Sequence, residues 1–274
     1  PNAEGDWLNQ RNDVFDTFIP MAPEKKFEAK SQSFFNTYAV GANTARDAWA
    51  YNFSYLELGE NMKNMISFYN DERVRIAKLR NQNLLKDFNK DLNSDPKKIS
   101  WSVNLKKDLE RLKEYSFDKK YIITSSYRPF CKQKLYFHKP FIERPGLNDS
   151  FFPNQEITNQ VICVSPSPND NIAVLITDSL ANLHFNGDSQ CFPLYYYKEN
   201  EKHNPGLFDT AREDDYIRRD GVSDFILTRA KKQYGKNVSK EDIFYYVYGI
   251  LHSPDYRTAF ANDLKKMLPR IPLV

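Results

Sequence analysis

The stretch from Tyr127 to Pro145, YRPFCKQKLYFHKPFIERP, interleaves aromatic residues with cations. Side chains alternate between the two faces of an extended strand, which places Lys132, Lys134 and Tyr136 on one face. The intervening residues can then enter a core while this face offers positive charge to a polyanion such as DNA. The alternative is an ordinary edge strand whose lysines keep other chains from pairing with it.

Positive charge gathers in the part of the chain that this stretch ends. Residues 71–145 carry 19 Lys and Arg against 10 Asp and Glu, a net charge of +9, whereas residues 1–70 and 146–274 each carry a net charge of −3. Such clustering is expected of a nucleic-acid binder, although two solvated lysine-rich helices would give the same count. The candidates for phosphate contact are Lys97, Lys98, Lys106, Lys107, Arg128, Lys132, Lys134, Lys139 and Arg144.

Residues that could carry catalysis do not form a recognisable set. The four histidines show neither HExxH nor HxxxH spacing, and GxSxG, GxGxxG and GxxxxGK[ST] are all missing from the sequence. Asp178 and His184 could form a hydrolytic pair near a strand end, but no nucleophile in a strained turn accompanies them. The acidic run Glu213-Asp214-Asp215 could hold a hard cation, yet flanking arginines favour a charge-balanced loop. We therefore predict no catalytic or metal-ligating residue.

Helical patterns come before the cationic stretch. Residues 1–54 are expected to be an irregular lead-in, in which the aromatic run Arg46 to Ser54 packs as a strand or turn. Ser54 followed by Glu57 is a capping-box signature, and apolar residues recur at helical spacing as far as Leu92, in one long helix or in two. A second pattern follows Trp101, with Leu105, Leu109 and Leu112 on one face. Residues 55–115 are therefore predicted to be helical.

Strand patterns occupy residues 121–197. Short connections rich in proline, asparagine and glycine separate them and favour a mixed or antiparallel sheet. The aromatic run Tyr195-Tyr196-Tyr197 could stack on bases, but burial of alternate aromatics explains much of the pattern equally well and is the interpretation that we favour. The expected strands are Tyr121–Thr124, Lys134–His138, Gln160–Val164, Ile172–Thr177 and Gln190–Tyr197.

Residues 222–268 return to a helical pattern. One helix is expected to end at Gly235, Ser239 caps the next, and Ser253-Pro254 begins a third. This predicts a helical hairpin whose last apolar face includes Phe260 and Leu264. The whole chain, residues 1–274, is thus predicted to be one α+β unit with an N-terminal helical region, a central mixed or antiparallel sheet and a C-terminal helical hairpin.

Composition limits the class of protein. With 274 residues, 41% of them hydrophobic, the chain can bury a sizeable core, and no apolar run approaches the roughly 18 residues of a membrane span. The three cysteines form no CxxC, which fits a reducing cytoplasm better than a disulfide or zinc framework. Because the first residue is Pro1, we expect a fragment of a longer protein.

Seven segments, taken together, resemble the C-terminal target-recognition region of the type ISP restriction-modification enzymes. They are distributed in the family's order over nearly the whole chain, and the last, which is long and uninterrupted, is the most specific. The segments are GDWLNQRND (Gly5 to Asp13), RDAWAYNFS (Arg46 to Ser54), ISWSVNLKKDL (Ile99 to Leu109), YRPFCKQKLYF (Tyr127 to Phe137), LITDSLANLH (Leu175 to His184), QCFPLYYY (Gln190 to Tyr197) and EDIFYYVYGILHSPDYRTAFANDLKKMLPRIP (Glu241 to Pro272).

The resemblance implies a module that reads double-stranded DNA for an attached adenine methyltransferase and nuclease in a large bacterial protein. It also implies S-adenosylmethionine, ATP and Mg²⁺ as cofactors of that parent. The Asn-Pro-Pro-Tyr loop of such methyltransferases is missing, since Asn204-Pro205-Gly206 is not a match, so methyl transfer would belong to sequence upstream of Pro1. No base contact can be carried over, because base-contacting residues differ between targets.

Two other functions remain open at this point. The chain could be a spacer that couples the motor to the methyltransferase without binding DNA itself. It could also be an independent hydrolase that uses Asp178 and His184, although this would require a nucleophile that the sequence does not show.

Overall fold

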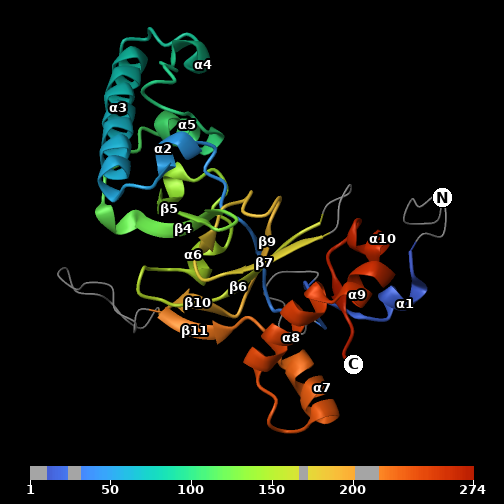
Figure 1. Ribbon diagram of the computed structural model, residues 1–274. Helices are drawn as coiled ribbons and strands as arrows, with labels where there is room; N and C mark the ends of the chain where they lie inside the picture. Colours follow the sequence, from blue (N-terminus) through green and yellow to red (C-terminus); the bar gives the residue numbers. More distant parts are fainter. Residues whose placement is uncertain (1–10, 24–31, 167–171, 201–215) are drawn as a thin grey trace. The chain divides into compact units, whose positions relative to one another are not determined.

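The computed structural model describes residues 11–23, 32–166, 172–200 and 216–274. The fold is α+β, as predicted (Figure 1). Residues 5–10 of the first matching segment, Asn204-Pro205-Gly206 and the acidic run Glu213-Asp214-Asp215 lie outside the described residues. Among those described, no helix has the length and apolar character needed to cross a membrane.

The chain divides into two compact units. The first, here called the sheet unit, comprises Pro1–Gly41, Ser126–Pro129 and Gly146–Val274; the second, here called the α3 unit, comprises Ala42–Ser125 and Phe130–Pro145. Each unit is therefore assembled from segments that are distant in the sequence.

An antiparallel sheet forms the centre of the sheet unit. Its strand order is β2-β9-β6-β7, and all five residues of the central strand β6 are buried. Two further pairs, β1 with β12 and β10 with β11, are also antiparallel. The strands are β1 (Ile19–Pro20), β2 (Ala39–Val40), β6 (Val161–Ser165), β7 (Ala173–Thr177), β8 (Leu180–Ala181), β9 (Gln190–Pro193), β10 (Tyr195–Glu199), β11 (Tyr216–Asp220) and β12 (Arg270–Ile271).

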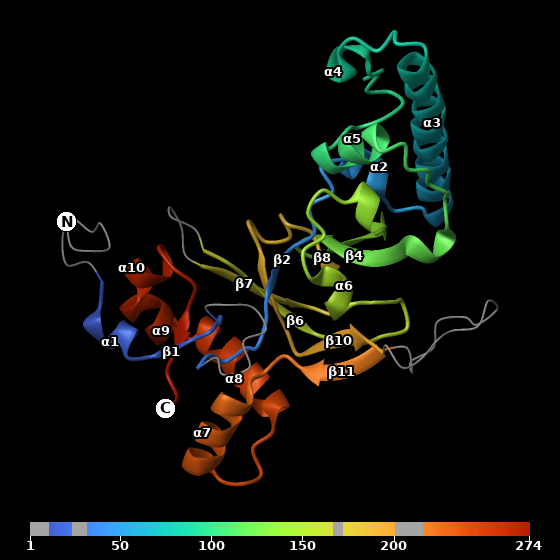
Figure 2. The ribbon, with the colours of Figure 1, turned by 180° about the vertical axis from the view of Figure 1, so that it is seen from behind.

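C-terminal helices pack on this sheet, with α8 against β7 (Figure 2). Phe35 joins the two layers, because its ring lies 5.2 Å from that of Phe192 on β9 and 6.1 Å from that of Phe244 on α8. All three rings are fully buried. The helices of this unit are α1 (Asp13–Asp16), α6 (Asn148–Phe151), α7 (Asp224–Tyr234), α8 (Lys240–His252), α9 (Pro254–Ala259) and α10 (Ala261–Leu264).

Local capping explains where these helices begin and end. Gly235 follows α7 with a φ of 107°, a conformation that glycine adopts without a steric penalty. Ser239 and Asp242 form a reciprocal capping box at the start of α8. Both features agree with the sequence prediction. The last predicted helix is interrupted at Phe260, which leaves the helical conformation, although Leu264 is buried as expected.

The expected strand from Gln190 to Tyr197 is in fact two strands, β9 and β10, separated by Leu194. The amide of Leu194 donates to the carbonyl of Gln160, and its own carbonyl accepts from the amide of Gly221. The chain therefore changes partner at Leu194, from β6 to β11.

The α3 unit is built around one 27-residue helix, α3 (Tyr55–Asn81), which Ser54 caps by accepting from the amide of Glu57. The buried side of α3 packs with Leu105 and Leu109 of α5 and with Tyr136 of β5. The other elements of this unit are α2 (Asp47–Ala50), β3 (Tyr51–Asn52), α4 (Phe88–Asp91), α5 (Val103–Glu110), β5 (Cys131–Tyr136), the short 3₁₀ turns η1 (Lys119–Tyr121) and η2 (Lys139–Phe141), and the first part of β4 (Ile122–Arg128), whose last three residues belong to the sheet unit.

Both predicted helices of this unit are shorter than the apolar pattern suggested. Asn83 takes a φ of 54° just after α3, and Leu112 takes a φ of 55° just after α5. Each residue therefore leaves the right-handed helical region and ends its helix. Leu85 and Phe88, which continue the apolar pattern of α3, pack against the same core from outside that helix.

A buried carboxylate ties the segment after α3 back to the helix. Glu72, 4% exposed, accepts from Arg75 Nε at 2.8 Å and from the amide of Asn93 at 2.8 Å. Burial raises the pKa of Glu72, but these hydrogen bonds and the charge of Arg75 outweigh it, so the pKa lies below its ordinary value. The carboxylate of Glu72 is therefore ionised, and it holds the segment around Asn93 against α3.

We expect replacement of Gly221 by alanine to destabilise the sheet unit. A β-carbon at Gly221 would lie 1.8 Å from the carbonyl oxygen of Pro193, so backbone must move. The expected loss in free energy of unfolding is about 1–3 kcal/mol. Gly249 in α8 is the matched control, because its β-carbon would meet nothing within 4 Å and alanine in a helix should stabilise by about 0.5–1 kcal/mol. Thermal unfolding that moved both variants in the same direction would contradict this account.

Glu72→Gln should lower the free energy of unfolding by about 1–2 kcal/mol, because it removes a charge-assisted hydrogen-bond network. A lowered folded-state pKa stabilises the fold above the ordinary value of 4.5, and this stabilisation is lost as the pH falls through the folded value. The difference in melting temperature between the variant and the wild type should therefore hold near neutral pH and shrink below pH 4.5. Glu60→Gln, at an exposed ion pair with Lys63, should have little effect at any pH.

Candidate nucleic-acid interface

Eight of the nine cations predicted to contact phosphate belong to the α3 unit, and Arg128 belongs to the sheet unit. The α3 unit carries 20 Lys and Arg against 13 Asp and Glu, a net charge of +7, and the remainder of the chain carries −4. Arg46 is an exception within the α3 unit, because it is 3% exposed and cannot reach a ligand at the surface. The charge asymmetry seen in the sequence is therefore a property of one structural unit.

Only the first part of β5 presents positive charge on the predicted face. Lys132 is exposed, and Lys134 donates to Thr124 Oγ1 at 3.0 Å. Tyr136, which alternation placed on the same face, is fully buried and stacks on Phe117. This part of the interpretation was wrong, because the end of β5 enters the core of the unit. Before the strand, Phe130 lies in a turn with its side chain 97% exposed.

A groove along α3 brings two of the predicted lysines together with side chains that the sequence analysis did not select. It has a volume of about 440 Å³. We call it the α3 groove. Its lining consists of Trp49 from α2, Asn61, Asn64, Ser67, Phe68 and Asp71 from α3, and Lys97 and Lys98 from the loop before α5.

The chemistry of the α3 groove suits a nucleic acid. The ammonium of Lys98 lies 5.5 Å from the ring centre of Phe68. Among the residues described, no hydrogen bond engages the side-chain amides of Asn61 and Asn64 or the ammonium of Lys97. Asparagine amides can bind the edge of adenine and lysines can bind phosphate, so both kinds of contact are available in one groove. The spacing of residues 61, 64, 68 and 71, one turn apart on a helix, was the signal that could have located it.

The other predicted cations of the α3 unit are dispersed. Lys106 on α5 donates to Asn89 Oδ1 at 3.4 Å, and Lys107 is exposed on the same helix. Lys139 begins η2, and Arg144 pairs with Asn43 through backbone hydrogen bonds in both directions. These residues add positive charge but do not share one pocket with Lys97 and Lys98.

Arg128 already has partners within the sheet unit. Its Nη1 donates to Asn182 Oδ1 at 2.9 Å and to the carbonyl of Tyr127 at 2.6 Å. The guanidinium also lies 3.9 Å from the ring centre of Tyr127. A phosphate at this position would bind a guanidinium whose orientation is already fixed.

The paired strands β10 and β11, here called the ribbon, carry two exposed arginines that the sequence analysis missed as ligand contacts. Arg218 and Arg219 are consecutive on β11 and so point to opposite faces. Across the ladder, Arg219 faces Tyr196 and Arg218 faces Tyr197. Phe192 on β9 is buried, whereas the three tyrosines of β10 are only half-buried. Burial alone therefore does not account for the tyrosines, and the signal available in the sequence was the consecutive pair Arg218-Arg219.

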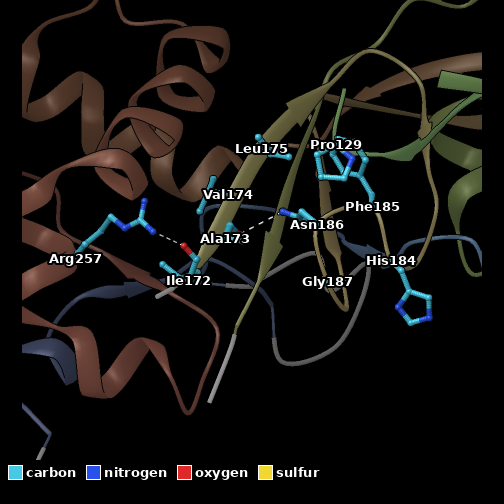
Figure 3. Close-up of a pocket in the computed structure, with 10 residues that line it drawn as sticks. All are labelled: Pro129, Ile172, Ala173, Val174, Leu175, His184, Phe185, Asn186, Gly187 and Arg257. Carbon is cyan, nitrogen blue, oxygen red and sulfur yellow. Dashed lines mark hydrogen bonds between the residues drawn. The ribbon is translucent and has the colours of Figure 1, made fainter. Parts of the chain in front are cut away.

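A cavity in the sheet unit offers no support for a hydrolase. It measures about 450 Å³ and is lined by Ile172, the first residues of β7, Pro129, Arg257 and the segment His184–Gly187. Arg257 donates to the carbonyl of Ile172, and the ring of His184 points away from β7 (Figure 3). The carboxylate 3.3 Å from Nδ1 of His184 is that of Asp188. The carboxylate beside His184 is therefore not that of Asp178, the partner considered from the sequence.

Two buried thiols, Cys163 and Cys191, lie side by side with their sulfur atoms 3.7 Å apart. The hydrogen bond between them, together with burial, raises the pKa of Cys163 well above its ordinary value. A thiol in this state is not a nucleophile at neutral pH. Within the described ranges, no group of three or more His, Cys, Asp or Glu is arranged to hold a metal ion.

Solved structures similar to this chain include three complexes with DNA or a DNA substrate mimic. A nuclease-deletion mutant of the Type ISP restriction-modification enzyme LlaGI, in complex with a DNA substrate mimic, has a TM-score of 0.77 and 33% identity, covering 98% of this chain and 22% of its own. The ATP-dependent Type ISP enzyme LlaBIII bound to DNA gives 0.82 and 31%, covering 100% and 16%. The DrdV–DNA complex gives 0.83 and 30%, covering 100% and 25%.

The chain thus spans between 16% and 25% of the length of those proteins. A search of curated protein sequences found no significant match. A family model described as the Type ISP C-terminal specificity domain matches residues 33–274. Because that match covers most of the chain, the chain belongs to the family of Type ISP C-terminal specificity domains.

Proposed function

We propose that this chain recognises a specific sequence of double-stranded DNA for an adenine methyltransferase and a nuclease of the same parent protein. The α3 groove carries the proposal, because two asparagine amides that have no hydrogen-bond partner in the described part of the chain lie beside lysines suited to phosphate. The family is that of Type ISP C-terminal specificity domains, and the three similar structures are complexes with DNA or a DNA mimic. S-adenosylmethionine, ATP and Mg²⁺ would act in other parts of that parent.

The proposal assigns different roles to the two kinds of side chain. Lysines of the α3 unit would neutralise phosphates, release counterions and bring any duplex to the surface. Asn61 and Asn64 would contact base edges and so distinguish the target from other sequences. A net charge of +7 on the α3 unit favours binding of DNA there before any base is read.

Reversing both lysines of the α3 groove, Lys97→Glu with Lys98→Glu, should weaken binding to every duplex by a similar factor. Each lost phosphate contact should reduce the slope of log K against log salt by about 0.9. Lys132→Glu with Lys134→Glu should act in the same way. Fluorescence titrations of target and random duplex over a range of salt concentrations measure both effects.

The matched control is Lys231→Glu with Lys232→Glu, an adjacent exposed pair at the end of α7 in the sheet unit. It makes the same change in net charge and should leave the slope close to that of the wild type. An equal loss of affinity in this pair would place the DNA elsewhere. If neither lysine pair of the α3 unit mattered, the spacer function would be favoured.

Asn61→Ala with Asn64→Ala should reduce the preference for the target and leave the salt slope unchanged, because amides contact bases without releasing counterions. One well-placed amide contact to adenine is worth about 1–3 kcal/mol of discrimination. Competition titrations with target and random duplex give this ratio directly. A variant that retained the full preference would exclude the groove as a base reader.

A further inference from the structure

The β10–β11 ribbon has the form of an element that enters a DNA groove. It is an antiparallel ladder that runs from the pair Tyr195 and Asp220 to the pair Glu199 and Tyr216. Among the described strands, neither β10 nor β11 pairs with any other. The major groove of B-DNA is about 12 Å wide and admits a two-stranded ribbon.

Hydrogen bonds anchor one end of the ribbon to the rest of the sheet unit. Asn159 donates to the carbonyl of Tyr195 at 2.7 Å and accepts from its amide at 3.1 Å. On the other strand, Lys240 pairs with Asp220 at 2.9 Å. A two-stranded ribbon is marginally stable alone, so these anchors give it a fixed direction.

The two arginines of β11 have different surroundings. Arg218 lies on the face of Tyr195 and Tyr197, and its guanidinium is 4.5 Å from the ring centre of Tyr195. Within the described part of the chain, this guanidinium has no carboxylate or hydrogen-bond partner. Arg219 lies on the opposite face. There burial raises the pKa of Tyr196, and the positive charges of Arg219 and Lys240 partly oppose that shift.

Stacking on a ring restrains a guanidinium while its N–H donors remain available at the edge. Arginine held in this way loses less conformational freedom on binding than a lysine would. Its planar pair of donors matches the O6 and N7 acceptors that guanine presents in the major groove. The Tyr195 ring thus restrains the guanidinium of Arg218 in a way that suits a bidentate contact. Among the contacts described, no aromatic ring restrains Arg219.

We propose that the ribbon enters the major groove of the target and that Arg218 reads one guanine through its O6 and N7 atoms. The inference rests on the proposed function, because it requires that the chain bind duplex DNA. Arg219, on the other face, would contact phosphate. The specificity of the module would then depend on a residue of the sheet unit, which has no net positive charge, as well as on the α3 groove.

The test uses the 274-residue chain and begins with selection from a randomised duplex library, which identifies the target. Each guanine of that target is then replaced in turn by 7-deazaguanine, which lacks the N7 acceptor. For the wild type, replacement at one guanine should weaken binding several-fold, less than the roughly 5- to 150-fold loss of a whole bidentate pair, because O6 remains. In Arg218→Ala the same replacement should have almost no further effect, and in Arg218→Lys, which can still donate to N7, the penalty should be smaller than in the wild type.

Arg219→Ala is the matched control, because it removes the same charge from the neighbouring position of the same strand. It should weaken binding to target and random duplex equally and should retain the full penalty for 7-deazaguanine. Thermal unfolding of all variants checks that the ribbon is retained. Arg218→Lys keeps the charge and most of the side-chain length, so it separates loss of base reading from loss of phosphate attraction.

The outcomes separate this inference from the proposed function. A target without guanine, or a 7-deazaguanine penalty that persists in Arg218→Ala, would overturn the assignment while leaving DNA recognition intact. A penalty that disappears in Arg219→Ala instead would show that the opposite face reads the base. If the wild type bound no duplex, both the inference and the proposed function would fail.

Discussion

The ionised carboxylate of Glu72 is the constraint on which the α3 groove depends. It accepts the amide of Asn93, and Asn93 in turn accepts from the indole of Trp101 and from the amide of Asp95. Asp95 then accepts from the amide of Lys97. This chain of hydrogen bonds holds the loop before α5 in place, so Lys97 and Lys98 line the groove together with residues of α3. The buried carboxylate of Glu72 thus helps to fix the positions of Lys97 and Lys98 at the surface.

Fixing the loop in this way has a consequence for affinity. Ordering side chains and loops on binding costs about 0.5–1.5 kcal/mol for each immobilised side chain, and a surface ordered beforehand avoids part of that cost. In the α3 groove, hydrogen bonds that begin at Glu72 order the loop backbone, while no hydrogen bond among the described residues engages the ammonium of Lys97. For the DNA binding proposed above, this arrangement would keep long-range attraction for phosphate and reduce the loss of conformational freedom that would otherwise weaken base contacts.

Sequence patterns correctly predicted the features that depend on interactions between residues close in the sequence. Ser54 and Ser239 cap helices where expected, Gly235 ends one, and β6 pairs antiparallel with β7 across a short connection. The end of α3 was missed because Leu85 and Phe88 supply the same apolar pattern from outside the helix. The α3 groove was missed because it joins α2, α3 and a loop that are distant in sequence, and only three-dimensional packing brings them together.

The ribbon depends on an equally non-local constraint. At Leu194 the chain leaves the central sheet, and the amide of Gly221 donates to the carbonyl of Leu194 as β11 returns. The backbones approach so closely there that a β-carbon on Gly221 would lie 1.8 Å from the carbonyl oxygen of Pro193. A side chain at Gly221 would therefore displace the backbone where the chain passes from β9 to β10 and where β11 ends. The recognition proposed for the ribbon depends in this way on a residue that contacts no base and is required only because it has no side chain.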